Sequence, residues 1–304
     1  MRRYGYVFLW LSLIPAVLFC HTSGVAVSWC SGVLPCLRSA LARLTSAAAF
    51  PVCSVFFLPF AALAVFCCTS KSRAFLPCFA GFLILSISLT WLAPCALSED
   101  MNMPDPAHLQ QLCKEFSQQA VFCKPERRDF IPENVLIEAS RLTGAGITPK
   151  PALFPSAAKA LGIAGWWSPL TSEAVVDATL SELNLPFVAC HELMHAKGVA
   201  SEAQANYLAY LACMQGDAIF RYSGTMNALW YAMRCLRDTD ESAWEAAVSD
   251  MDTDVRANFC RMNGLAEAAP SPLSALQDTL TRLYLSLSGT ADYDAFAAWL
   301  VFSE

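Results

Sequence analysis

Hydrophobic residues follow two different patterns along the chain, which change near residue 98. Before that point they form long runs without a charged residue, and three runs (4–20, 47–68 and 75–97) are long enough to span a bilayer. After that point apolar residues recur three or four positions apart between polar ones, which is the spacing of amphipathic helices. The pattern predicts N-terminal transmembrane helices, about three of them in a membrane anchor at 1–97, followed by a mainly α domain at 98–304.

The second part contains segments with recognisable helix ends. Asp105 and Pro106 are typical of a helix start, and apolar residues follow them at helical spacing up to Val121. A second helix is predicted from Pro132 and is expected to end at Gly144. Further helices are predicted at 206–221, 226–236, 242–250, 274–286 and 293–301. Residues 162–167 and 174–177 are predicted to form two short strands joined by a turn at 168–169.

The composition agrees with a membrane portion. The 304 residues are 56% hydrophobic and only 15% charged, with a mean hydropathy of +0.41. A soluble protein of this size is normally about one quarter charged. Residues 1–97 contain six basic residues and no acidic one, whereas the rest holds 14 basic and 26 acidic residues. The apolar runs make a lipid bilayer an expected partner. The acidic part has no basic patch and no glycine-rich nucleotide loop, so nucleic acid is not an expected partner.

The basic residues also indicate an orientation. Arg2 and Arg3 place the N-terminus in the cytoplasm, and the pair Lys71 and Arg73 places the loop before the third run there as well. Three spans then put 98–304 outside a bacterial cell membrane, as the extracytoplasmic domain of a multi-pass protein. Basic residues at 38 and 43 favour the opposite side for the first loop. The first run is expected to be a retained anchor, because no clean cleavage site for a signal peptide follows it.

The stretch from His191 to His195 reads His-Glu-Leu-Met-His, which is the zinc-hydrolase pattern H-E-x-x-H. Residues four apart lie on one face of a helix, so both histidines can present a ring nitrogen to the same metal ion. Glu192 lies one step round the helix. We expect it to stand beside the metal-bound water as a general base without becoming a ligand.

A third ligand is predicted just downstream. Gly198 is suited to end the first helix in a left-handed turn, and Ser201 is suited to cap the next one, with Gln204 completing a capping box. That turn brings Glu202 back towards the two histidines. Two histidines, one carboxylate and an open position for water are the ligand count of a catalytic Zn²⁺ site. Asn206, one turn beyond Glu202, is a candidate to hydrogen-bond the outer atom of a ligand.

Around these residues the sequence resembles a bacterial family of uncharacterised multi-pass membrane proteins, in which a few membrane helices precede an HExxH domain. The resemblance is carried by 191–195, Gly198 and 202–213, and by the flanks 162–170 and 185–187. The run from Glu202 to Asn206 is also similar to the Glu-x-x-Ala-Asp of membrane-bound gluzincin peptidases, whose glutamate is the third zinc ligand. Here Asn206 stands in place of the aspartate. The resemblance implies a zincin-like α+β metallopeptidase domain with a small sheet, and a peptide or protein substrate.

These observations predict a membrane-anchored zinc-dependent peptidase with Glu192 as the general base. Two alternatives stay open: a non-catalytic metal-binding membrane sensor or scaffold, and a zinc amidase that acts on cell-wall peptides. The presence of Glu192 disfavours the first, because a structural zinc site has no use for a carboxylate that is not a ligand. The small sheet either offers its edge to an extended substrate or packs the helix with Trp166 and Trp167 as core.

Several other side chains have two interpretations each. Tyr207 and Tyr210 on the ligand-bearing helix are candidate oxyanion donors, although aromatic residues at helical spacing are more often core. The chain has 14 cysteines. The pairs 113 with 123 and 235 with 260 are possible disulfides, but spacing does not define connectivity. Cys190 and Cys213, which flank the metal motif on apolar stretches, are interpreted as buried packing residues.

Overall fold

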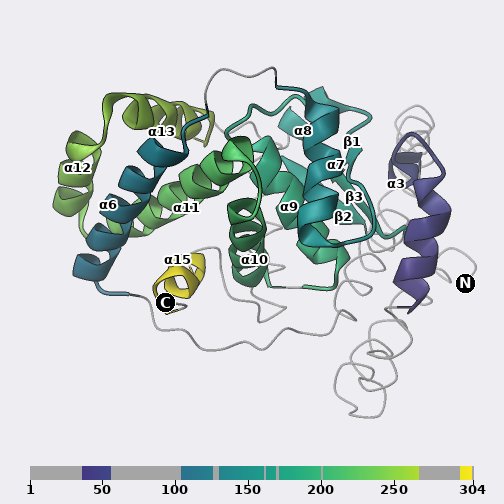
Figure 1. Cartoon of the computed structure of the whole chain (residues 1–304), viewed down its shortest axis with the longest axis horizontal. Coiled ribbons are helices and arrows are strands. Elements are labelled where there is room, and N and C mark those ends of the chain that lie inside the picture. The colour runs from purple at the N-terminus through teal and green to yellow at the C-terminus, as the bar shows by residue number, and fades with distance from the viewer. Residues whose placement is uncertain are drawn as a thin grey trace, which may run out of the picture.

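The computed structural model describes residues 36–55, 104–125, 130–160, 162–168, 171–199, 201–266 and 295–302. These residues form a mainly helical structure with one small sheet (Figure 1). Residues 36–46 are helical and precede the labelled elements. In chain order these are α3 (Val52–Val55), α6 (Pro106–Cys123), α7 (Pro132–Thr143), β1 (Lys150–Pro151), α8 (Pro155–Ala160), β2 (Gly165–Ser168), β3 (Glu173–Val176), α9 (Leu185–Ala196), α10 (Glu202–Met214), α11 (Ala218–Thr239), α12 (Glu241–Asp250), α13 (Thr253–Ala266) and α15 (Ala295–Phe302).

Helix α9, which carries the HExxH motif, lies in the core. It contacts α7, α10 and α11 as well as strands β2 and β3 (Figure 1). Its sequence LPFVACHELMHA is apolar on most sides, and eight of its 12 residues are buried. A helix that is apolar nearly all round is stable only when other elements surround it. The sequence of α9 therefore places the metal motif inside the protein rather than on its surface.

The long helix α11 holds the start of α9 in place. The Leu183 carbonyl accepts hydrogen bonds from Ser223 Oγ (2.8 Å) and Asn227 Nδ2 (2.9 Å), both from α11. Ser223 Oγ also accepts a bond from the backbone N–H of Phe187 at 3.2 Å. Ser223 is fully buried, and the first backbone N–H groups of a helix have no partner within the helix itself. The serine therefore satisfies a buried helix terminus and ties the two helices together.

The sheet has the order β1-β3-β2. Strand β1 pairs with β3 in parallel, and β2 pairs with β3 antiparallel, with Gly165 opposite Val176 and Ser168 opposite Glu173. All four residues of β3 are buried. The two strands predicted from the sequence are present, although β2 begins three residues later than expected. The two-residue strand β1 was not predicted, because two residues carry no periodicity.

The predicted ends of α6 and α7 are confirmed. Asp105 caps α6 by accepting a hydrogen bond from the His108 backbone N–H at 2.9 Å, and Gly144 ends α7 with a φ of 61°. The apolar face predicted for α6 included Val121, but this residue is 46% exposed, and the neighbouring Ala120 is buried instead. Helix α12 and the described part of the last helix also lie close to their predicted ranges. The predicted helix at 274–286 lies outside the described residues.

The predicted break between 221 and 226 is wrong. The chain instead breaks after Met214, and α11 begins behind its cap Asp217 and continues through Gly224. A Cβ atom on Gly224 would lie only 2.7 Å from the Cβ of Cys213. The glycine therefore allows α10 and α11 to approach closely and does not interrupt a helix. Helix α13 was not predicted from the sequence.

The prediction of membrane spans is corrected by the structure. In the part of the chain that is described, no helix combines the length and the apolar character needed to cross a bilayer. This finding contradicts the predicted fold class with N-terminal transmembrane helices, and also the predicted multi-pass localisation with 98–304 outside a bacterial cell membrane. The runs 4–20 and 75–97, and most of 47–68, lie outside the described residues. At 47–51 the chain turns and reaches Pro51 before the four-residue helix α3, so the apolar run there is not one continuous helix.

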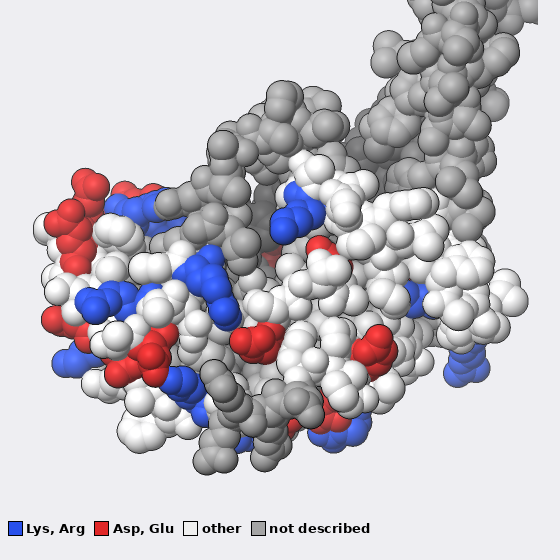
Figure 2. Space-filling view, turned by 90° about the horizontal axis from the view of Figure 1, so that it is seen from above, with Lys and Arg blue, Asp and Glu red and all other residues white. Residues whose placement is uncertain are grey.

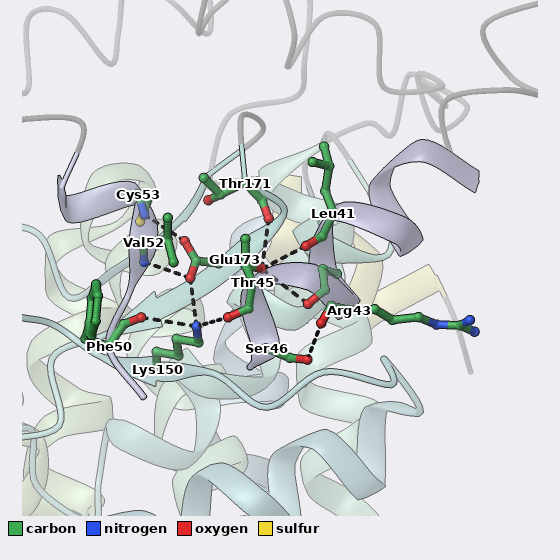
Figure 3. Close-up of polar contacts among 11 residues, drawn as sticks. Leu41, Arg43, Thr45, Ser46, Phe50, Val52, Cys53, Lys150, Thr171 and Glu173 are labelled. Carbon is green, nitrogen blue, oxygen red and sulfur yellow. Dashed lines mark hydrogen bonds and ion pairs between the residues drawn. The ribbon is translucent and has the colours of Figure 1, made fainter. Parts of the chain in front are cut away.

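The described N-terminal segment, 36–55, is attached to the sheet through a buried ion pair (Figure 3). Glu173 on β3 accepts hydrogen bonds from the backbone N–H groups of Val52 (2.8 Å) and Cys53 (2.7 Å). Lys150 on β1 donates to Glu173 at 2.8 Å and to the Thr45 carbonyl at 2.6 Å. The side chains of Lys150 and Glu173 are 12% and 2% exposed. This contact crosses the domain boundary that the charge pattern predicts near residue 98.

Charged side chains of both signs gather at the end of the molecule occupied by α6, α12 and α13 (Figure 2). Two of the ion pairs there join distant parts of the chain: Lys124 contacts Asp254, and Arg261 contacts Glu182 at 3.5 Å. These side chains are at least 44% exposed. Such pairs contribute little to stability, and on the face shown in Figure 2 the two signs are interspersed rather than separated.

Candidate metal centre

The turn between α9 and α10 has the geometry that its sequence predicts. Gly198 adopts a φ of 100°, and the backbone N–H of Val199 donates to the Met194 carbonyl at 3.1 Å. These features close α9 as a glycine-terminated helix. Ser201 then caps α10 by accepting a bond from the Gln204 backbone N–H at 3.3 Å. The second half of the predicted capping box is absent, because Gln204 Oε1 is buried and has no partner.

The turn brings His191, His195 and Glu202 together. The two Nε2 atoms are 3.0 Å apart, and Glu202 Oε2 lies 3.2 Å from His191 Nε2 and 3.5 Å from His195 Nε2. Ligands about 2.05 Å from a tetrahedral zinc ion are separated by about 3.3 Å. The three donor atoms therefore already have the mutual spacing of three corners of a zinc tetrahedron. Within the described residues, the cluster has these three members and no fourth protein ligand.

The ring of His195 is oriented for metal binding by the turn itself. His195 Nδ1 lies 2.7 Å from the Val199 carbonyl, and a carbonyl can only accept a hydrogen bond. The Nδ1 atom must therefore carry the proton, and in the neutral ring the Nε2 lone pair faces Glu202 and His191. A metal-binding histidine is usually held in this way, by an acceptor at its other nitrogen. The donor set fits Zn²⁺, which binds imidazole nitrogen and carboxylate oxygen.

The electrostatics of the cluster favour a cation. Burial alone would lower the pKa of His195, but the neighbouring carboxylate of Glu202 raises it to about 9. Burial alone would raise the pKa of Glu202, but His195 and His191 hold it far below the ordinary range. A proton at His195 and a metal ion use the same Nε2 lone pair, so they compete for the site.

Glu192 is not one of the three ligands, but it lies under strand β2 and close enough for their charges to act on its carboxyl group. It is buried, and burial raises the pKa of its carboxyl group above the usual value against the opposing effect of the two histidines. A Cβ atom on Gly165 would lie 2.8 Å from Glu192 Cγ and 2.9 Å from its Oε1. The backbone of β2 can therefore pass directly over the carboxylate only because residue 165 is glycine.

This contact gives a prediction for Gly165→Ala. The added methyl group should displace the Glu192 carboxylate, because its Cβ would also lie 3.0 Å from the backbone oxygen of Val175 on the paired strand β3 and so has no free space to occupy. We expect zinc content to stay the same and cleavage of a peptide to fall roughly 10- to 100-fold, the cost of misplacing a reacting group by about 1 Å. The measurement is kcat/KM together with the zinc content of the purified protein.

The control is the same substitution in a Glu192→Gln background. If alanine at 165 acts through the Glu192 carboxylate, it should have little further effect once that carboxylate has been replaced. An equal loss in both backgrounds would show that the methyl group disturbs the sheet rather than the carboxylate, and would remove Gly165 from the site.

Other residues singled out by the sequence are placed differently. Asn206 is buried on α10, but its Nδ2 has no partner, and His191 Nδ1 is also buried without one. Among the described residues no hydrogen bond joins Asn206 to a ligand, so that role stays a prediction. Tyr207 stacks on Trp299 of α15 with ring centroids 5.4 Å apart, and Tyr210 meets Phe116 of α6 edge-on at 5.7 Å. Both tyrosines therefore pack the helices together.

The cysteines beside the motif do not join the metal cluster. Cys190 and Cys213 are fully buried free thiols. Burial raises the pKa of Cys213 well above its ordinary value, and hydrogen bonding with Cys190 adds to this. The interpretation of both as packing residues agrees with these positions. The cysteines at 113, 123, 235 and 260, which the sequence left open as disulfide pairs, form no disulfide in the structure.

Comparison with known proteins gives a family but no activity. A family model described as "Protein of unknown function (DUF3810)" matches residues 127–301. No curated protein and no solved structure matches the chain. The matched range contains α7, the sheet, α9 and α10, and with them the three candidate ligands, Glu192 and Gly165. The helix at 36–46 lies before it.

Proposed function

The chain belongs to the DUF3810 family, a family of unknown function, and from the geometry of its own side chains we propose that it is a zinc-dependent peptidase. The observation that carries the proposal is the cluster of His191, His195 and Glu202 beside a buried carboxylate, Glu192, that is not part of it. A purely structural zinc site more often fills all four positions with protein ligands. Three ligands and a separate base are the requirements of hydrolysis.

In this proposal His191, His195 and Glu202 hold the metal. Zinc, when bound, lowers the pKa of a water molecule towards neutrality and polarises the carbonyl of the scissile bond. Glu192 accepts the proton of the attacking water and delivers it to the leaving amine. Its burial supports both roles, because a carboxyl group with a raised pKa is a stronger proton acceptor and can hold the proton until the amine leaves. Val199 keeps the His195 ring in the required tautomer through its carbonyl.

Strand β2 supports an extended peptide as the substrate. It pairs with β3 on one side, and among the described residues no strand pairs with its other side. An extended peptide can add to such an edge through backbone hydrogen bonds. Because Gly165 at the start of β2 lies over Glu192, a peptide bound along this edge would pass the general base. The edge therefore supplies a binding mode for an extended peptide that leads past the general base.

The metal assignment is tested by Glu202→Ala. The intact wild-type chain is expected to bind about one zinc ion, and the variant is expected to bind zinc more than 100-fold more weakly. This exceeds the roughly 10- to 100-fold cost of losing a residue that only orients a ligand. Zinc affinity is measured by competition with a chelator, and cleavage is measured with a peptide library.

The matched control is Glu245→Ala, which removes an exposed glutamate from α12 and should leave both properties unchanged. Wild-type affinity in Glu202→Ala would mean that the third ligand is wrongly assigned. Zinc binding by wild type without cleavage of any library member would favour a metal-binding scaffold. Cleavage restricted to peptides joined to amino sugars would favour the zinc amidase.

A further inference from the structure

One face of the helix at 36–46 packs against the rest of the protein and carries an arginine. Arg38, Ala42 and Thr45 lie on one face at helical spacing and are each 8% exposed. Leu37 and Leu44 on the outer face are 52% and 75% exposed. An arginine side chain is almost never fully buried unless it is paired. The burial of Arg38 therefore needs an explanation.

Among the residues that the structure describes, Arg38 contacts an aromatic ring rather than an anion. Within the described residues, no carboxylate, carbonyl or hydroxyl group accepts a hydrogen bond from its guanidinium group. Its Cζ lies over the ring of Trp167 on β2, 5.1 Å from the ring centroid. Burial lowers the pKa of Arg38, which is the effect of removing water from a cation without supplying an anion. A ring face attracts the guanidinium cation but gives its N–H groups no oxygen or nitrogen acceptor.

Trp167 supplies a second donor without an acceptor. Its Nε1 is buried and makes no hydrogen bond. Most buried polar atoms have a partner, so the indole nitrogen lacks an acceptor that an anion beside Arg38 would supply. A carboxylate has two oxygens and several lone pairs, and it matches the planar fork of a guanidinium group. One carboxylate would satisfy the arginine and the indole together.

This pair of donors lies beside the candidate metal centre. Gly165 and Trp167 are two positions apart on β2, so they share a face of the strand and are separated by about 7 Å. Gly165 is the residue that lies against Glu192. Arg38 also lies near the turn between the two ligand-bearing helices: its Nη1 is 3.4 Å from the position of a Cβ on Gly198. The donors are therefore about two residues of extended peptide away from the general base.

The position of Arg38 is held by the attachment of its segment to the sheet (Figure 3). Thr45, two turns further along the same helix, donates from Oγ1 to the Thr171 carbonyl at 3.2 Å, and its own carbonyl accepts from Lys150. These contacts come from residues more than 100 positions away in the chain. They fix the helix on the sheet with Arg38 and Thr45 on the inner face.

We propose that Arg38 and the indole N–H of Trp167 form a carboxylate-binding subsite, which selects peptides carrying a carboxylate within about two residues of the scissile bond. The proposal rests on the proposed peptidase function in assigning this ligand to a substrate. The carboxylate is either the C-terminus of the peptide or an acidic side chain. Both present the same chemistry to the two donors, and the experiment separates them.

The test is a binding measurement on the intact chain after zinc has been removed with a chelator, so that no cleavage occurs. The indole ¹H–¹⁵N resonance of Trp167, assigned by its loss in Trp167→Phe, is followed during titration with four probes. These are acetyl-Ala-Ala-Ala, its C-terminal amide, the amide of acetyl-Ala-Asp-Ala, and inorganic phosphate. We expect a downfield shift with at least one carboxylate probe and none with the uncharged amide. The responding carboxylate probe identifies the source.

The matched variants are Arg38→Gln and Arg43→Gln, since Arg43 is an exposed arginine on the same helix. Losing a hydrogen bond to a charged group should weaken binding of the carboxylate probe roughly 10- to 100-fold in Arg38→Gln, and Arg43→Gln should match wild type. The melting temperature should not fall in Arg38→Gln, because the arginine has no ion pair to lose. A fall in melting temperature with unchanged binding would make Arg38 structural and overturn the subsite.

Two further results would overturn the proposal: a shift caused by inorganic phosphate but by neither carboxylate probe, and an equal shift with the uncharged amide. The proposed peptidase function fails separately. If no peptide is cleaved by the zinc-loaded chain but the carboxylate shift depends on Arg38, the subsite stands and the reaction is wrong. If wild type cleaves acidic and amidated peptides equally well, the reaction stands and the subsite is wrong.

Discussion

Glu192→Gln is expected to lower peptide cleavage by about 100- to 10,000-fold while zinc affinity stays at the wild-type value. That range is the usual contribution of a positioned general acid–base group. Glutamine has nearly the size of glutamate, so it should fit under Gly165 in the same space. It cannot accept the proton of the attacking water. Because Glu192 is not part of the metal cluster, its replacement leaves His191, His195 and Glu202 intact.

The measurements are kcat/KM with a cleavable peptide, zinc affinity and melting temperature, each compared with Glu245→Gln as the exposed control. The melting temperature should be unchanged or higher, because the substitution removes a buried carboxyl group whose ionisation burial disfavours. Equal cleavage by the variant and wild type would remove Glu192 as the base. Loss of zinc from the variant would contradict the ligand assignment.

Lys150→Met is expected to detach the segment 36–55 from the sheet. The substitution leaves the Glu173 carboxylate buried without its cation, and breaking a buried ion pair in this way costs about 3–5 kcal/mol. The Thr45 carbonyl loses its donor at the same time. Hydrogen exchange of backbone amides in 36–55 should become much faster, with little change in α9 and α10. Binding of the carboxylate probes should weaken as in Arg38→Gln, because Arg38 is on the detached segment.

The control is Lys124→Met, which breaks the exposed ion pair with Asp254 and should change neither property. Unchanged exchange at 36–55 in Lys150→Met would show that the apolar contacts of the segment suffice to hold it. In that case the buried pair would not be what positions Arg38.

The same attachment should depend on pH. Burial alone would raise the pKa of Glu173, but hydrogen bonds from Lys150 and from the backbone N–H groups of Val52 and Cys53 hold it below its ordinary value. The pair therefore contributes its full stability above the unfolded glutamate pKa of about 4.3. That contribution is lost as the pH falls through the lower pKa of the folded protein. Amide exchange at 36–55 should accelerate, relative to α9, only below about pH 4.

Much of the ligand cluster could be predicted from the sequence, because the relevant interactions are local. His191 and His195 share a helix face through the 3.6-residue repeat, and Gly198 and Ser201 determine the turn that follows. Each of these features depends on atoms within a few residues along the chain. For the same reason the ends of α6 and α7, at Asp105 and Gly144, lie where the sequence predicts them.

Predictions that took composition as a sign of conformation were less accurate. The break predicted between 221 and 226 falls inside α11, where Gly224 leaves the space that Cys213 of α10 occupies. The run 47–68 is apolar enough for a span, but apolar character does not ensure a continuous helix, and the chain turns before Pro51. In both cases the residue type was compatible with two conformations, and contacts from other elements selected one.

The sequence by itself determined which side chains can hold a metal and which carboxylate stands beside them. The tertiary structure alone decided the surroundings of that centre. It placed Gly165 over Glu192 and brought Arg38 to Trp167, across 129 positions of the chain. The physical reason is that a helix repeat relates neighbours in sequence, whereas a missing hydrogen-bond partner is defined only when all packed elements are in place. The contact between Arg38 and Trp167 cannot be inferred until the position of the strand beneath the helix is known.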